Sequence, residues 1–251
     1  MRKWIRCLCA LVMVCCIGYL VYDGVMTKRR ENFYQVLMET DSGNGNAAPD
    51  SSRGNKAGLL ESLKRKNPEC AAVVTIPGTT INYPVMQTER EEGIYYLRRN
   101  FKGEHETGGT PFLDVRCSLK GPDENLIVYG HNMRNLTMFG TLKQYAKKEY
   151  YEEHPVFLLD YGQENTEYEI CAVLKLDVGK QEDIWFYEQI HWDTEEGAQE
   201  FVDFIKQRSL YSTEAEPKAG DLFVTLSTCS YHADAGRLAV VGMQKTKQLQ
   251  K

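Results

Sequence analysis

Several features that mark common classes of protein are missing from this chain. Its 251 residues carry a net charge of −5, so no basic field points to nucleic acid. No internal repeat with a period of about 20–50 residues is visible. Charged residues at 26% and hydrophobic residues at 42% are typical of a folded globular protein, and the length suits one domain with appendages.

Cysteine is too sparse outside one region to build a disulfide framework. Four of the eight cysteines lie in an apolar N-terminal run, and the other four are widely scattered: Cys70, Cys117, Cys171 and Cys229. We expect Cys70 and Cys171, which stand in apolar contexts, to be core residues. Cys229 and His232 form a Cys-x-x-His pair, but two further ligands at zinc-site spacing are missing, so we predict no metal and no cofactor.

The N-terminal run is the one long hydrophobic stretch. Cys7 to Tyr22 contains no charged residue in sixteen positions, which is roughly 24 Å of helix against about 30 Å of bilayer hydrocarbon. Flanking apolar residues extend it, so we interpret it as a transmembrane anchor. A cleaved signal peptide is the alternative, although no clear small-x-small cleavage site follows. Basic residues stand on both sides of the run, so its orientation is not decided by charge.

The composition then divides the chain into three parts. Residues 1–27 are predicted to be the N-terminal tip and the anchor, and residues 28–55 a juxtamembrane segment and linker. Within that segment, 28–40 is expected to be a short helix, and 41–55 is rich in Ser, Gly, Asn and Asp. Residues 56–251 form the predicted catalytic domain, which opens with a helix that ends before Asn67-Pro68.

Short strand signals dominate this domain. Eight segments with Gly, Pro and Asn between them predict a mainly β fold, a closed or nearly closed barrel. The segments are 72–76, 80–85, 110–113, 125–129, 156–160, 168–176, 221–227 and 237–243. Two helices are expected between strands, at Phe139–Tyr150 and at Thr194–Gln207, with Thr194 as the N-cap of the second.

Three residues at the ends of predicted strands suggest nucleophilic chemistry. Cys229 ends the strand Val224–Thr228, His131 follows Leu126–Tyr129, and Arg237 begins the next strand. A thiol at its ordinary pKa is only a few per cent thiolate at neutral pH, so it needs a neighbour such as His131. An arginine stays protonated and can stabilise an oxyanion. The alternative is that Cys229 is a small buried hydrophobic residue.

These segments together resemble the sortases, and specifically the class B sortases. The sequence Thr225-Leu226-Ser227-Thr228-Cys229 is similar to the family's TLxTC signature, and Tyr129-Gly130-His131-Asn132 to the segment of its catalytic histidine. Arg237 stands in the place of the catalytic arginine. The likeness extends from about Asn67 to Gln244 and includes 80–85, 96–97, 100–103 and 109–114. The helix at 194–207, between the sixth and seventh strands, is similar to the insertion that sets class B apart.

The resemblance implies an eight-stranded sortase-type β-barrel with N-terminal helices and that inserted helix. It implies a membrane-anchored cysteine transpeptidase of the Gram-positive cell surface, with the N-terminus inside and the catalytic domain outside. Cys229 would cleave a C-terminal sorting motif after threonine and form a thioester. His131 would move protons and Arg237 would stabilise the oxyanion. An amine of peptidoglycan would then take the acyl group, and calcium is not expected.

The resemblance also gives residues that line the substrate groove: Leu97, Tyr129, Ser227 and Thr228. Two departures leave the sorting motif open. Gly93 stands where some class B enzymes have a substrate-contacting asparagine, and Ser230-Tyr231 replaces an acidic residue often found after the cysteine. A cysteine peptidase that passes its acyl group to water would use the same residues, and a non-catalytic surface adhesin is the third alternative.

Overall fold

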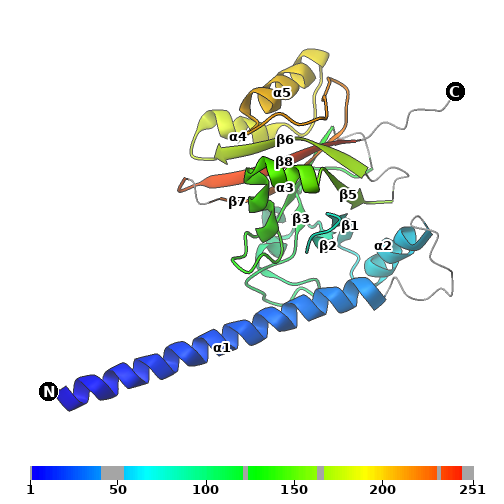
Figure 1. The fold of residues 1–251 in the computed structure, drawn as a ribbon. Helices are drawn as coiled ribbons and strands as arrows, with labels where there is room; N and C mark the ends of the chain where they lie inside the picture. The colour runs from blue at the N-terminus through cyan, green and yellow to red at the C-terminus, as the bar shows by residue number, and fades with distance from the viewer. Residues whose placement is uncertain (1, 41–53, 121–123, 163–166, 231–232, 245–251) are drawn as a thin grey trace. The chain divides into compact units, whose positions relative to one another are not determined.

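The computed structural model describes residues 2–40, 54–120, 124–162, 167–230 and 233–244. The chain forms two compact units, Met1–Asn46 and Ala47–Lys251. The first contains helix α1 (Arg2–Thr40), drawn in blue in Figure 1, and the second contains every other element. The greater part of the predicted linker, residues 41–53, lies outside the described residues.

Helix α1 is one continuous helix. The short helix predicted at 28–40 is its C-terminal part, because neither a proline nor any other break separates it from the apolar run. Its stretch Cys9–Glu39 is long and apolar enough to cross a membrane, a test that a signal sequence also passes. Apolar side chains in the first part of this stretch, such as Leu11 and Leu20, are exposed, and an anchor would bury them in lipid.

The second unit is a closed barrel, and each of the eight predicted strands is present. The strands are β1 (Cys70–Thr75), β2 (Asn82–Met86), β3 (Phe112–Leu113), β4 (Asn125–Tyr129), β5 (Val156–Asp160), β6 (Glu167–Asp177), β7 (Phe223–Cys229) and β8 (Gly236–Gln244). Around the barrel their order is β1-β2-β3-β4-β7-β8-β6-β5. Closure pairs β5 with β1, so the described sheet has no exposed edge.

Two joints in the barrel are parallel, and one of them decides the position of the site. Strands β2 and β3 are parallel, and so are β4 and β7, whereas the other neighbours are antiparallel. Strands β4 and β7 run in register from Asn125 beside Phe223 to Tyr129 beside Ser227. Both strands therefore end at the same edge, and the residues that follow them meet there.

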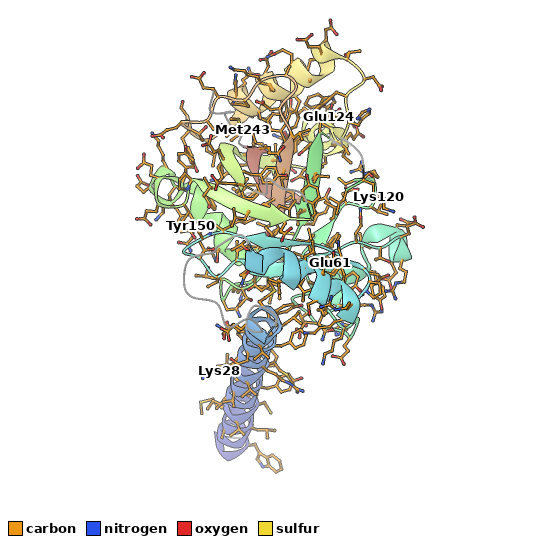
Figure 2. All side chains as sticks on the ribbon, turned by 90° about the vertical axis from the view of Figure 1, so that its right-hand side faces the viewer. Lys28, Glu61, Lys120, Glu124, Tyr150 and Met243 are labelled. Atoms are coloured by element: carbon orange, nitrogen blue, oxygen red, sulfur yellow. The ribbon has the colours of Figure 1, made fainter. Side chains whose placement is uncertain are left out.

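Strands β4 and β7 are also the most deeply buried part of the barrel. Residues 125–128 and 223–228 are all buried, which explains the apolar run at 126–128 in β4, whereas β7 also buries Thr225, Ser227 and Thr228. The buried Asn125 has polar partners, because its Oδ1 accepts from the Thr225 hydroxyl at 3.0 Å and its Nδ2 donates to the Gln189 carbonyl at 2.8 Å. Glu124 and Met243, labelled in Figure 2, mark the opposite end of the barrel from Cys229.

The helices differ more from the sequence-based expectations than the strands do. The described helices of the second unit are α2 (Gly54–Lys66), η1 (Arg90–Gly93), η2 (Tyr95–Arg98), η3 (Gly140–Ala146), α3 (Lys148–Glu153), α4 (Gln181–Glu188) and α5 (Glu195–Arg208), where η marks a 3₁₀ helix. The predicted N-cap is confirmed, since the Thr194 hydroxyl accepts from the Gly197 N–H at 3.1 Å. Helices α4 and α5 lie against β6 (Figure 1).

Two helix expectations are corrected. The single helix predicted at Phe139–Tyr150 is a 3₁₀ helix and a short α-helix, because Lys147 between them is extended, with φ −110° and ψ 134°. Helix α4 was not predicted. Its buried face contains Asp183 beside Phe186 and Tyr187, so a hydrophobicity pattern does not reveal it. The burial of the Asp183 carboxylate is compensated by Arg208, whose Nη2 donates to Asp183 Oδ1 at 2.6 Å.

Candidate active site

Cys229 is the residue at which β7 leaves the core. The six preceding residues of the strand are buried and Cys229 is exposed, so the alternative of a buried core cysteine is wrong. Its thiol is free, as are the thiols of the buried Cys70, Cys117 and Cys171. The strand therefore anchors the Cys229 backbone in the barrel while its side chain meets solvent.

Arg237 lies directly across the ladder from Cys229. The two residues are partners in the antiparallel β7/β8 register. Side chains of directly opposed residues point to the same face, with Cβ atoms about 4.5–5.5 Å apart. One of the guanidinium N–H groups donates to the Gly236 carbonyl at 3.0 Å, which orients the half-buried side chain beside the thiol. A cation thus lies next to Cys229.

His131 follows β4 and is brought to the end of β7 by three hydrogen bonds beyond the strand ladder. The Gly130 N–H donates to the Ser227 carbonyl at 3.0 Å, and the Thr228 hydroxyl donates to the Gly130 carbonyl at 2.7 Å. Nδ2 of Asn132 donates to the Cys229 carbonyl at 2.8 Å. The sequence expectation that the two strand ends meet in space is therefore confirmed.

The His131 ring is fixed as well as its backbone. Its Nε2 lies 2.8 Å from the Leu97 carbonyl oxygen. A carbonyl can only accept, so Nε2 carries a hydrogen in this arrangement, and proton exchange by the neutral ring falls to Nδ1. The backbone carbonyl of His131 accepts from the N–H groups of Met133 and Phe139. These bonds hold the histidine in one orientation at the edge of the barrel where β7 ends.

The residues predicted to line a substrate groove surround this arrangement. Leu97 and Tyr129 are half-buried, and Leu97 supplies the carbonyl to His131. Ser227 and Thr228 are buried, at 1% and 2% exposure. The Ser227 hydroxyl bonds to the Tyr187 hydroxyl at 2.8 Å. Direct contact with a substrate stays a prediction for these residues.

A polar network beneath the site was not predicted from the sequence. The Tyr129 hydroxyl donates to Asp114 Oδ2 at 3.0 Å, and Arg116 binds the Asp114 carboxylate through Nε and Nη2 at 2.9 and 2.7 Å. Arg116 Nη2 also donates to the Tyr187 carbonyl at 2.8 Å, and the Tyr129 and Tyr187 rings stack at 6.2 Å. No sequence signal links Asp114 and Arg116, in the loop after β3, to Tyr129 on β4 and Tyr187 on α4, because these elements are separate in the chain.

This network has a defined charge state. Burial opposes ionisation of Asp114, but the hydrogen bonds and charge of Arg116 outweigh it, so the pKa of this carboxyl is lowered. Burial and the nearby Asp114 raise the pKa of the Tyr129 hydroxyl, which therefore stays protonated and donates. Burial likewise raises the pKa of Tyr187, so its hydroxyl also stays protonated.

The two departures from the family pattern have different outcomes. Gly93 has φ +86°, and a Cβ there would lie 2.7 Å from the Val115 Cβ, so this position cannot hold an asparagine without rearrangement. Tyr231 lies outside the described residues, as does His232 of the Cys-x-x-His pair. Within the described residues, no group of three or more His, Cys, Asp or Glu side chains is arranged to hold a metal ion.

A closed barrel that presents a cysteine, a histidine and an arginine at adjoining strand ends is the arrangement expected of an enzyme with a cysteine nucleophile, such as a cysteine transpeptidase. The comparisons with known proteins identify the family. The chain is 31% identical to Sortase B of Listeria monocytogenes serovar 1/2a over 203 residues, which is 80% of each protein. It is 30% identical to Sortase B of Staphylococcus aureus over 184 residues, or 72% of each. The chain belongs to the sortase B family.

Solved structures agree with this assignment. A Staphylococcus aureus sortase B–substrate complex matches with a TM-score of 0.73 and 25% identity, covering 90% of this chain and 99% of that one. Sortase B from B. anthracis in complex with AAEK1 matches with a TM-score of 0.73 and 27% identity, covering 89% and 99%. No family model matches the chain. The predicted sortase-type barrel is therefore confirmed, and the chain is an enzyme, so the adhesin alternative is not retained.

Proposed function

We propose that the enzyme cleaves a C-terminal sorting motif after its threonine and transfers the acyl group to an amine of peptidoglycan. The observation that supports this most directly is the exposed Cys229 thiol beside Arg237, at the edge where His131 is held. One similar structure is described as a sortase B–substrate complex, and another as sortase B complexed with triglycine, a peptide that carries an amine.

The reaction begins with acylation of Cys229. The Cys229 thiol first gives its proton to Nδ1 of His131. The thiolate sulfur then adds to the threonine carbonyl carbon, and the oxygen of the resulting tetrahedral intermediate carries a negative charge. The Arg237 guanidinium stabilises this oxyanion, a contribution of about 3–4 kcal/mol per donor in comparable sites. The carbon–nitrogen bond then breaks, and the leaving amine takes a proton from His131. The product is a thioester on Cys229.

Deacylation reverses these roles. The acceptor amine adds to the thioester carbonyl, His131 accepts the proton that the amine loses, and the Cys229 thiolate leaves. Leu97 and Tyr129, which are partly exposed, face the sorting motif, and the buried Ser227 and Thr228 support this wall from behind. The peptidase alternative follows the same first half and differs only because water replaces the amine.

The first experiment uses the full chain in detergent micelles with a library of threonine-containing sorting peptides. Intact mass should show an acyl adduct that disappears in Cys229→Ala. Cys70→Ala is the matched control, because burial raises the pKa of the Cys70 thiol to about 12 and the adduct should persist without it. An adduct in Cys229→Ala would refute the assignment. When triglycine is added, the product released from the thioester should change from the acid to the triglycine amide. If only the acid is formed, the hydrolysis alternative is favoured.

We also propose that α1 is a retained anchor with the N-terminus inside and the barrel outside, as its length and apolar sequence permit. In this orientation the barrel domain is outside the membrane, on the side where the cell-wall substrates are. Protease added to intact protoplasts should remove the barrel domain, whereas full protection would contradict this orientation. Release of the barrel domain into the medium without protease would instead indicate a cleaved signal.

A further inference from the structure

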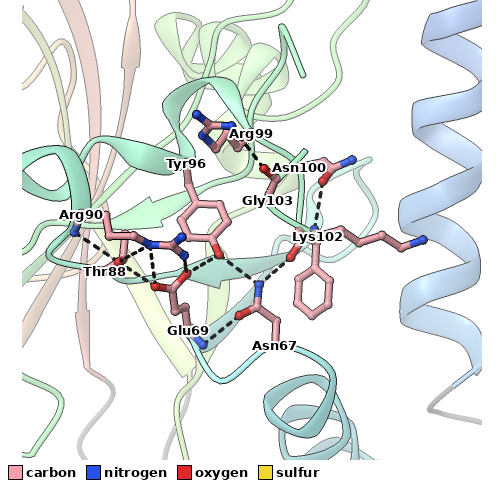
Figure 3. Close-up of polar contacts among 10 residues, drawn as sticks. Asn67, Glu69, Thr88, Arg90, Tyr96, Arg99, Asn100, Lys102 and Gly103 are labelled. Carbon is pink, nitrogen blue, oxygen red and sulfur yellow. Dashed lines mark hydrogen bonds and ion pairs between the residues drawn. The ribbon is translucent and has the colours of Figure 1, made fainter. Parts of the chain in front are cut away.

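A second polar cluster surrounds the Tyr96 hydroxyl. We call it the Glu69 clamp and define it as Asn67, Glu69, Thr88, Arg90 and Tyr96 (Figure 3). The Glu69 carboxylate accepts from the Tyr96 hydroxyl at 2.6 Å, from the Thr88 hydroxyl at 2.8 Å and from Arg90. Asn67 Nδ2 donates to the Tyr96 hydroxyl at 3.0 Å. None of these residues touches the proposed reaction.

The charges of the clamp favour this arrangement. Burial opposes the ionised form of Glu69, but hydrogen bonds from Tyr96, Arg90 and Thr88 outweigh it and lower its pKa. Burial and the bond to Glu69 raise the pKa of Tyr96 to about 12, so its hydroxyl remains a donor at neutral pH. The Tyr96 side chain is 1% exposed. A buried hydroxyl on a carboxylate is a strong, directional tie.

The backbone at Tyr96 is held as tightly as its side chain. Its carbonyl accepts from the Thr110 N–H at 3.0 Å. Gly109 approaches so closely that a Cβ there would lie 2.6 Å from the Tyr96 carbonyl oxygen and 2.4 Å from that of Leu97. Tyr96 and Leu97 both belong to η2, a single short 3₁₀ turn. The clamp therefore fixes the turn whose next carbonyl, that of Leu97, lies 2.8 Å from His131 Nε2.

We propose that Glu69 and Tyr96 are positioning residues for His131, acting through the Leu97 carbonyl. This inference rests on the proposed function, because it assigns them a part in the proton transfers of His131. The clamp keeps the carbonyl in line with Nε2 and so holds the ring in the Nε2–H form with Nδ1 toward the reaction. Leu97 also belongs to the predicted substrate wall. The Glu69 clamp therefore positions both His131 and one residue of the substrate groove.

Removal of one oxygen atom tests the idea. Tyr96→Phe keeps the ring and deletes the bonds to Glu69 and Asn67. Displacement of catalytic groups by about 1 Å costs up to about 100-fold, so kcat should fall at least about tenfold, with a smaller change in KM. Glu69→Gln should have a weaker effect, because an amide oxygen still accepts from Tyr96 but no longer pairs with the Arg90 charge.

Tyr145→Phe is the matched control. Tyr145 is fully buried and its hydroxyl donates to the His154 carbonyl at 2.9 Å, so the same atom is lost from a bond that involves neither η2 nor His131. Both variants should lose thermal stability to a similar degree, but only Tyr96→Phe should lose kcat and shift the pH profile. Equal losses of kcat in both would show a structural effect and overturn the proposal.

The tautomer of His131 gives a readout that does not depend on turnover. Nitrogen NMR of the full chain in micelles, with the His131 signal assigned by His131→Gln, should show mainly the Nε2–H form. In Tyr96→Phe the Nδ1–H share should rise, and an unchanged ratio would overturn the proposal. The tautomer ratio is measured without substrate, so it tests the positioning role of Tyr96 independently of the proposed function. The proposed function is tested separately and fails if Cys229→Ala still forms the adduct.

Discussion

Substitution of Gly130, between Tyr129 and His131, should separate the geometry of the site from its chemistry. A Cβ at this position would lie 2.5 Å from Cγ and 2.6 Å from Cδ2 of Phe139. Phe139 is fully buried, and its N–H donates to the His131 carbonyl at 3.0 Å. Gly130→Ala therefore pushes on the loop that carries His131 without removing any reacting group.

The magnitude follows from the required movement. Ordinary carbon–carbon contacts are about 3.5–4.0 Å, so Gly130 and Phe139 must separate by about 1 Å. Overpacking of this kind costs about 1–3 kcal/mol. For a domain of this size the midpoint of thermal unfolding should fall by about 2–12 °C. A displacement of about 1 Å at His131 should lower kcat by about 100-fold, more than the loss of stability would explain.

The assay is acyl transfer with thermal unfolding of the same samples. Phe139→Ala removes the Cγ and Cδ2 atoms that clash, so Gly130→Ala should cost less in that background, with a coupling of about 0.5–3 kcal/mol. Gly58→Ala is the control, and it should change the free energy of unfolding in the opposite direction. Gly58 lies in helix α2 with no atom within 4 Å of its Cβ position, so alanine should stabilise the protein by about 0.5–1 kcal/mol. Unchanged kcat and stability in Gly130→Ala, or strictly additive effects, would refute the reasoning.

Three further predictions concern other parts of the site. Asn132→Ala should slow alkylation and acylation of Cys229 several-fold while the exposed Asn135→Ala does not, and equal rates in both would contradict the role of the Asn132 bond. Asp114→Asn should be less stable at pH 7. Because the folded pKa of Asp114 is lowered, this difference should disappear as the pH falls below about 4, and chemical unfolding at several pH values checks it. Gly93→Asn should destabilise by about 1–3 kcal/mol, since its φ of +86° and Val115 both oppose a side chain, and wild-type stability there would show that the loop adapts.

Local sequence was sufficient to predict most of the barrel. The strand signals found all eight strands, because alternating or continuous β-branched and apolar residues between turn residues report on backbone preference and burial together. The N-cap at Thr194 was found for the same reason, since the hydroxyl and the N–H that it binds are three residues apart. The break at Lys147 and helix α4 were not found, because tertiary packing overrides weak local preference there.

The sequence by itself determined which side chains can react and which strands end at them. The motifs named Cys229, His131 and Arg237, and the resemblance named the family that the comparisons then showed. Only the tertiary structure decided how these residues meet. The parallel pairing of β4 and β7 brings Asn132 to the Cys229 carbonyl, and the β2–β3–β4 pairings bring the Leu97 carbonyl, in the segment between β2 and β3, to His131. Such bonds join residues far apart in the chain, so no local preference encodes them and the topology of the barrel alone creates them.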